Sequence, residues 1–171
     1  MARYQAGEPV AFDGLYARYR GPLYRYLARH CEDPAVTDEL YQEAWLRVIQ
    51  ARSQWRPESR FAPWLFRIAR NLLVDHWRRR PAETEPIDEN VVDLANPWPE
   101  VWLRLRDCAE RLLKLLSGLA REQRDAFLLQ AEGELSLEQI AAVTGVGRET
   151  VKSRLRYAVK RLRAGLEDCH E

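Results

Sequence analysis

The chain has 171 residues, enough for one domain or two small ones, and a formal net charge of +1. This balance excludes a protein that holds nucleic acid through bulk positive charge, so any affinity for DNA must be local. Three cysteines and three histidines are scattered without metal-ligand spacing, which predicts reduced thiols, no disulfide framework, no metal and no cofactor. The first residues lack the apolar core of a signal peptide, and no run is long enough to span a membrane, so we expect a cytoplasmic protein.

Apolar residues recur at helical spacing and strand-like alternation is absent, which predicts an all-α fold. Helices are expected over about 11–30, 34–53 and 62–80, the second opened by Asp33 as N-cap and Pro34 at the first helical position. Residues 81–99 contain four prolines and little periodicity, and they read as a flexible linker. Further helices follow from Pro99 and over about 121–132. We therefore expect two small helical domains, 1–80 and 100–171.

The helix expected after Pro34 has a core row and a polar, acidic face. Val36, Leu40, Ala44 and Val48 repeat every four residues, and the acidic side chains lie between them without a lysine or arginine before Arg47. A charged face of this kind is most often only solvated, but it also suits docking to a basic partner.

The next helix, PWLFRIARNLLVDHWRRR, carries a polar row at spacings of four and three: Arg67, Asn71, Asp75 and Arg78. Asparagine reads base edges well, and arginine holds phosphate or base. The preceding loop combines aromatic, polar and cationic groups that suit an unstacked base, whereas Trp45 and Trp64 are expected to be core residues.

The segment SLEQIAAVTGVGRETVKSRLRYAVKRLRAGL predicts a helix-turn-helix. Ser136 and Gln139 form a capping box, Gly145 supplies the positive φ of the turn, and Gly165 suits the C-terminal stop. The second helix has a buried row and a basic face, which together favour DNA binding over an ordinary solvated helix.

Three motifs occur in order: DELYQEAWLRV, FAPWLFRIARNLLVDHWRRR and the helix-turn-helix, the last after a proline-rich spacer. Together they resemble the extracytoplasmic-function (ECF) class of bacterial RNA polymerase sigma factors, over nearly the whole chain. Two positions depart from that family's pattern. Tyr157 replaces a common arginine late in the recognition helix, and Gly147 replaces the Ser or Thr often found before it.

The resemblance implies a dissociable, non-catalytic subunit that directs polymerase to promoters through minus-35 and minus-10 elements. Its expected partners are the bacterial RNA polymerase core, promoter DNA and an anti-sigma factor. Docking on the core is expected of Asp38, Glu39, Leu40, Gln42 and Glu43. Minus-10 recognition, with a flipped base held by the loop, is expected of Trp55, Arg56, Glu58, Ser59, Arg60, Phe61, Arg67, Asn71, Asp75 and Arg78. Minus-35 recognition is expected of Arg148, Glu149, Lys152, Ser153, Arg154 and Arg156.

Two other classes compete with this interpretation. A stand-alone transcriptional regulator would explain the helix-turn-helix but not the acidic face, and it would bind promoters without polymerase. An enzyme acting on nucleic acid would need a nucleophile and base or a metal cluster, and no such grouping occurs in the sequence. For a polymerase subunit we expect the free protein to bind promoter DNA poorly, because two weak contacts gain affinity only when docking spaces them correctly.

Overall fold

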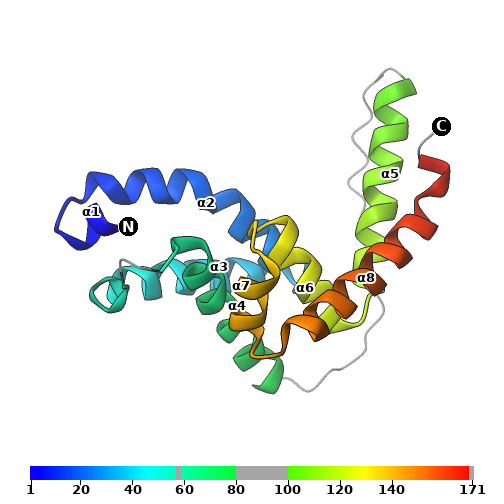
Figure 1. Cartoon of the computed structure of the whole chain (residues 1–171). Coiled ribbons are helices and arrows are strands. Elements are labelled where there is room, and N and C mark those ends of the chain that lie inside the picture. The colour runs from blue at the N-terminus through cyan, green and yellow to red at the C-terminus, as the bar shows by residue number, and fades with distance from the viewer. Residues whose placement is uncertain (57–58, 80–99, 170–171) are drawn as a thin grey trace.

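The computed structural model describes residues 1–56, 59–79 and 100–169, and all regular structure within them is helical (Figure 1). The expected linker, 81–99, and Glu58 lie outside the described residues. The N-terminal half holds α1 (Ala2–Gln5), α2 (Val10–Ala28), α3 (Pro34–Gln50), the short 3-10 helix η1 (Arg52–Gln54) and α4 (Phe61–Arg79). The C-terminal half holds α5 (Glu100–Ser117), α6 (Arg121–Ala131), α7 (Leu137–Thr144), α8 (Arg148–Gly165) and the 3-10 helix η2 (Glu167–Cys169).

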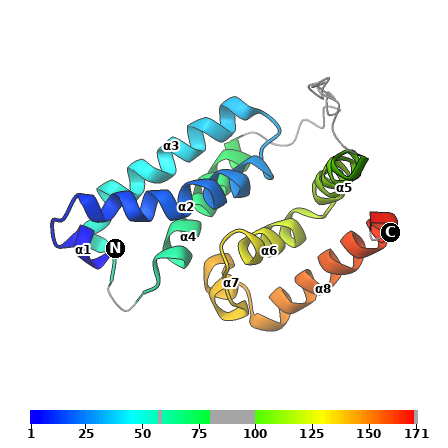
Figure 2. The same ribbon diagram turned by 90° about the horizontal axis from the view of Figure 1, so that it is seen from above.

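The three long helices of the N-terminal half, α2, α3 and α4, pack side by side (Figure 2). Asp33 caps α3 as predicted, since its carboxylate accepts a hydrogen bond from the Ala35 amide at 2.8 Å. Pro22 lies inside α2, which nevertheless continues to Ala28. Trp45 is buried as predicted, whereas Trp64 is only partly buried and keeps one side at the surface.

The predicted helix-turn-helix is confirmed in detail. Ser136 and Gln139 form both hydrogen bonds of the capping box, and Gly145 ends α7 in the left-handed region at φ 73°. Gly147 starts α8 without a side-chain cap. The buried face of α8 consists of Val151, Leu155, Ala158 and Leu162.

Gly165 has a different role from the one predicted. It is the last residue of α8 with no left-handed stop, and a Cβ atom there would lie 2.5 Å from the Leu115 methyl groups of α5. Glycine therefore allows the close approach of α5 to α8, because a larger residue would make the Leu115 side chain move.

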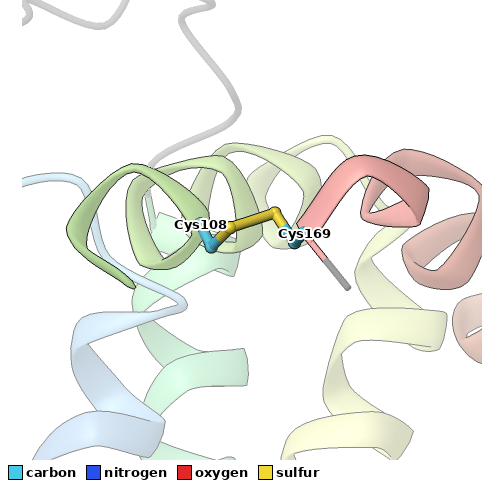
Figure 3. Close-up of a disulfide and its surroundings, with 2 residues drawn as sticks. All are labelled: Cys108 and Cys169. Atoms are coloured by element: carbon cyan, nitrogen blue, oxygen red, sulfur yellow. A yellow bond between two sulfur atoms is a disulfide. The ribbon is translucent and has the colours of Figure 1, made fainter. Parts of the chain in front are cut away.

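The cysteine prediction is wrong. Cys108 of α5 and Cys169 of η2 form a disulfide with Cα atoms 5.9 Å apart, which ties the outer part of α5 to the end of α8 (Figure 3). The two positions are 61 residues apart in sequence, and only the antiparallel packing of α5 and α8 brings them together. Cys31 is a free cysteine, and burial raises the pKa of its thiol to about 11, so it is a poor nucleophile at neutral pH.

The two halves share one apolar core. The main buried cluster runs from Leu23 and Tyr26 of α2 through Phe66 of α4 to Leu129 of α6, Ile140 of α7 and Leu155 of α8. Among the described residues, a small second cluster of Leu116, Leu119, Ala158 and Leu162 lies within the C-terminal half. Both views show α6 and α7 lying against the N-terminal helices, while α5 projects away from them (Figures 1 and 2). The shared cluster means that separating the halves would expose apolar surface from both.

Candidate nucleic-acid and polymerase interfaces

The acidic face, defined as Asp38, Glu39, Gln42 and Glu43, lies along the outside of α3. Asp38, Glu39 and Gln42 are exposed, and Glu43 is half-buried and paired with Arg47 at 2.8 Å. With Asp75 of α4, Glu39, Gln42 and Glu43 line a groove of about 460 Å³ between α3 and α4. Asp75, predicted to contact DNA, thus lies next to the acidic face, and it pairs with the exposed Arg78 at 3.2 Å.

Leu40 does not belong to this face. Its side chain is 7% exposed within the shared apolar core, because it lies in the same helical row as Val36, Ala44 and Val48. The apolar residues that do reach the surface beside the acidic face are Leu46 and Ile49, at 50% and 42% exposure. The sequence contained the signal for them, since both fall outside the core row of α3.

Arg67 and Asn71 lie in a second groove, of about 390 Å³, between α4 and the end of α3. We call it the Asn71 groove; its other lining residues are Arg47, Gln50, Ala51, Gln54, Trp64 and Ile68. Amide, guanidinium and indole groups thus converge on one concave surface, which suits the edges and faces of bases. Sequence reasoning missed Gln50 and Gln54, and it assigned Trp64 wholly to the core.

The loop between η1 and α4 is divided between interior and surface. Trp55 and Phe61 are buried, at 7% and 8% exposure, so neither ring is available to stack on a base in this structure. Arg56, Ser59 and Arg60 are exposed, and the Ser59 amide donates to the Arg56 carbonyl at 2.9 Å. Within the described part of the loop, the polar and cationic side chains therefore face outward and the aromatic side chains pack inside.

The basic face of α8 is exposed as predicted. Arg148, Glu149, Lys152 and Arg156 are open to solvent near the start of the helix, and Ser153 and Arg154 are half-buried beside them. Arg148 forms an ion pair with Glu138 of α7 at 2.8 Å, which links the two helices of the helix-turn-helix. Tyr157 is 52% exposed and lies under the guanidinium of Arg156 at 5.2 Å, so the tyrosine supports its neighbour where the family commonly has an arginine.

The two halves meet around Asp125 of α6, a carboxylate that is 4% exposed. It accepts a hydrogen bond from the Tyr26 hydroxyl at 2.7 Å, and its second oxygen accepts one from Arg70 Nε at 2.7 Å. His30 Nε2 lies 3.7 Å from the same carboxylate. A buried carboxylate is tolerated only when it is paired and hydrogen-bonded, and here every partner comes from the opposite half of the chain.

Polar contacts surround this centre. Arg25 pairs with Glu132 at 2.8 Å, and Arg67 donates to the carbonyl of Ala142 at 3.3 Å. Arg121 lies over the Trp77 ring, with 4.4 Å from its guanidinium carbon to the ring centroid. The close packing of the two halves thus engages Arg67, one of the residues predicted to contact DNA.

The turn between α6 and α7 is shaped for the same contact. A Cβ atom at Gly133 would lie 3.2 Å from the Phe66 ring of the opposite half and 2.7 Å from the Leu129 carbonyl. Glu134 adopts a positive φ of 53°, which is uncommon outside glycine. A groove of about 360 Å³ separates this turn from Arg18 and Arg60, so the acidic turn faces the cationic end of the loop.

Burial at the contact changes the ionisation of its members. Desolvation, reinforced by the neighbouring Asp125, raises the pKa of Tyr26 well above its ordinary value. Desolvation also lowers the pKa of His30 to about 4, outweighing the favourable charge of Asp125. His30 is therefore neutral at physiological pH.

Comparison with known proteins gives matches for both halves. Residues 15–82 match the family model of Sigma-70 region 2, and residues 109–162 match that of Sigma-70, region 4. The ECF RNA polymerase sigma factor SigL of Mycobacterium tuberculosis (strain ATCC 25618 / H37Rv) is 31% identical over 166 residues, which covers 95% of this chain and 93% of SigL. The RNA polymerase sigma factor CarQ of Myxococcus xanthus is 29% identical over 164 residues, or 95% of this chain and 93% of CarQ.

The chain belongs to the ECF family of RNA polymerase sigma factors. Its function is to direct promoter-specific initiation of transcription. The helices α2 to α4 constitute region 2, and the helix-turn-helix belongs to region 4.

Solved structures share the fold of this sigma factor. CnrH, in complex with the cytosolic domain of CnrY, aligns with a TM-score of 0.69 at 24% identity, covering 98% of this chain and 94% of CnrH. RpoE of Bartonella quintana, in complex with the anti-sigma factor NepR, aligns with a TM-score of 0.70 at 21% identity, covering 92% and 97%. Among the described residues of this sigma factor, no helix is both long and apolar enough to cross a membrane.

Proposed function

We propose that region 2 docks on the polymerase core through the acidic face and the adjoining apolar side chains of Leu46 and Ile49. The observation that carries this assignment is the combination on one surface of α3: the acidic side chains of Asp38, Glu39 and Glu43 lie beside two exposed aliphatic residues. Interfaces join an apolar centre to a charged rim in this way, and the acids select a basic partner.

Minus-10 recognition is assigned to the Asn71 groove together with the exposed loop residues Arg56, Ser59 and Arg60. The groove offers Asn71 and Gln54 for base edges and the partly exposed Trp64 ring for stacking. Arg78, exposed at the end of α4, is available for the phosphate backbone. Minus-35 recognition is assigned to the start of α8, where Arg148, Lys152 and Arg156 are exposed.

The closed arrangement of the free chain is proposed to open when polymerase binds. In the closed form Arg67 is bonded to the Ala142 carbonyl and the acidic α6–α7 turn lies opposite Arg60, so the minus-10 surface is not fully accessible. Docking would replace the contact between the halves with contacts to polymerase and space the two DNA-reading regions for simultaneous binding. Two weak contacts then gain affinity through effective concentration.

We place the protein in the cytoplasm with promoter DNA and polymerase, assign it no catalytic step, and expect an anti-sigma factor as a regulatory partner. The solved structures of CnrH and RpoE are themselves complexes, with CnrY and NepR.

The test is in vitro transcription from a promoter library by core polymerase with and without the chain. The wild-type chain should add a distinct set of start sites, and the double reversal Asp38→Lys with Glu43→Lys should abolish both these starts and binding to the core. The matched control is Asp13→Lys with Asp107→Lys, two exposed acids away from the acidic face. Retained core binding by the first variant would refute the docking assignment, and promoter binding without polymerase would indicate a stand-alone regulator instead.

A further inference from the structure

The N-terminal turn of the chain, before region 2 begins, lies against the segment that leads into the minus-10 loop. Helix α1 spans Ala2–Gln5, and Gly7, at φ 97°, reverses the chain into α2. The reversal is closed by hydrogen bonds from the amides of Gly7 and Glu8 to the carbonyls of Tyr4 and Arg3, at 3.2 and 3.0 Å. This short helix is therefore held in a defined position and is not a frayed end.

Tyr4 anchors α1 between two other elements. Its side chain is 7% exposed, and its ring packs on Phe12 of α2 with centroids 5.2 Å apart. The guanidinium of Arg52, in η1, lies 5.4 Å from the same ring. An aromatic ring held on one side by an aromatic and on another by a cation fixes the relative positions of α1, α2 and η1.

Gln5 then connects α1 to the backbone of the loop. Its Nε2 donates to the Trp55 carbonyl at 2.8 Å and to the Ser53 carbonyl at 3.2 Å. A helix leaves its last carbonyls without intrahelical partners, and one amide group here satisfies two of them at the end of η1. The next residue, Arg56, is the first exposed member of the loop.

We propose that Gln5 is a positioning residue for the minus-10 loop: by holding the Ser53 and Trp55 carbonyls, it fixes where the chain leaves η1 and so where Arg56, Ser59 and Arg60 meet the unpaired DNA strand. The inference rests on the proposed function of that loop. The extended backbone of Trp55, with φ −68° and ψ 134°, points the chain out of η1, and its ring is buried. Gln5 therefore acts on DNA only through the loop, and it has no contact with bases itself.

A purely stabilising role for α1 would give a different experimental signature. If Gln5 only stabilises region 2, its loss should lower the melting temperature and all activities together. If Gln5 positions the loop, its loss should slow promoter opening and reduce discrimination between bases at the captured position. Polymerase binding and minus-35 dependence should stay unchanged. The two roles are separated by measuring the melting temperature together with promoter opening, base discrimination, polymerase binding and minus-35 dependence on one variant.

The variant is Gln5→Met, which keeps the length of the side chain, adds no charge and removes both donated hydrogen bonds. Its matched control is Gln130→Met, at an exposed position of α6. With the holoenzyme on a duplex promoter, Gln5→Met should slow open-complex formation about fivefold to tenfold, the order set by losing one net hydrogen bond in the opened state. Discrimination between bases at the captured position should fall by a similar factor, and the control should match the wild type.

A loop variant, Arg56→Ala with Ser59→Ala and Arg60→Ala, distinguishes the two possible failures. If this triple variant opens promoters normally, the proposed function of the loop is wrong. If the triple variant is impaired while Gln5→Met opens promoters and selects bases like the wild type, only the positioning role is overturned. The positioning role is also overturned if Gln5→Met lowers the melting temperature and polymerase binding in proportion to the rate of promoter opening. That result would indicate a stabilising role.

Discussion

Regions 2 and 4 of this sigma factor bury their hydrophobic residues in different ways. Region 2 buries aromatic as well as aliphatic side chains from three long helices, among them Trp45, and its Tyr26 and Phe66 belong to the core shared with region 4. Among the described residues, region 4 buries aliphatic side chains: Leu129 and Ile140 belong to the shared core, and Leu116, Leu119, Ala158 and Leu162 form a separate cluster. Region 4 in the free chain therefore gains part of its packing from region 2.

The proposed opening of the chain on polymerase would expose the core that the two regions share. The outer surfaces of region 2 carry the groups that we propose to bind polymerase and the minus-10 element. Region 4 exposes its basic helix but covers its apolar side with region 2. Opening the contact costs apolar burial and the hydrogen bonds of Asp125, so it should occur only when polymerase offers replacement contacts.

The largest effect is expected from breaking the contact at its buried centre. Asp125→Ala removes the partner of Arg70 and Tyr26 and leaves a buried hydroxyl unsatisfied, which should lower the free energy of unfolding by about 3–5 kcal/mol. Urea denaturation measures this, and small-angle scattering should show a larger radius of gyration. Asp107→Ala, an exposed acid of α5, should stay within about 0.5 kcal/mol of the wild type. Equal effects of the two variants would show that region 4 does not depend on this contact.

Region 4 has a second source of stability in the Cys108–Cys169 disulfide. Cys108→Ser should lower the free energy of unfolding of the oxidised protein by about 2–4 kcal/mol, because the crosslink restricts a long loop of the unfolded chain. In the presence of dithiothreitol the wild type and the variant should unfold alike. Equal stability under oxidising conditions would mean that region 4 does not gain from the crosslink.

The exposed helix of region 4 should respond in function without responding in stability. Lys152→Ala and Arg156→Ala should each weaken dependence on the minus-35 element by about 1–3 kcal/mol where the side chain reaches a base. Neither should change the melting temperature, since both side chains are exposed. Transcription from promoters with single-base changes in the element measures this, and unaltered discrimination would refute direct readout.

The smallest effect is a pH dependence from His30, which lies at the contact between the regions. Its pKa in the folded protein, about 4, is below the ordinary 6.5, so the unfolded state binds the proton first. The neutral His30 gives its full contribution to the free energy of unfolding well above pH 6.5. That contribution falls by about 1 kcal/mol between pH 7 and pH 5.5, because the unfolded state takes up the proton. His30→Gln should remove this part of the pH dependence and His76→Gln should keep it; the reverse result would place the titration elsewhere.

Local features of the fold were predictable from sequence because their causes are local. The Asp33 cap, the Ser136 and Gln139 capping box and the positive φ of Gly145 depend on neighbouring residues only, and all are confirmed. The long helices were predicted to within a few residues for the same reason. The four-residue α1 was missed because it is held by contacts to Phe12 and Arg52, which lie in other elements.

Features that depend on contacts between distant residues were not predictable. In the sequence, Asp125 does not differ from the other charged residues of its helix. Its role is evident only from its hydrogen bonds with Tyr26 and Arg70 in the structure. Leu40 was assigned to the docking surface although it is buried, because spacing gives a helix face but not what lies opposite it. The disulfide was missed because the pairing of α5 with α8 sets the distance between its cysteines.

The most direct test is the distance between regions 2 and 4 before and after polymerase binding. Labels introduced as unnatural amino acids at Ala17 and Gln130, both exposed, report it by double electron–electron resonance. A single short distance is expected for the free chain, replaced by a longer one when core polymerase is added. The same distance in both states, or a broad long distribution in the free chain, would contradict the closed form and its opening on polymerase.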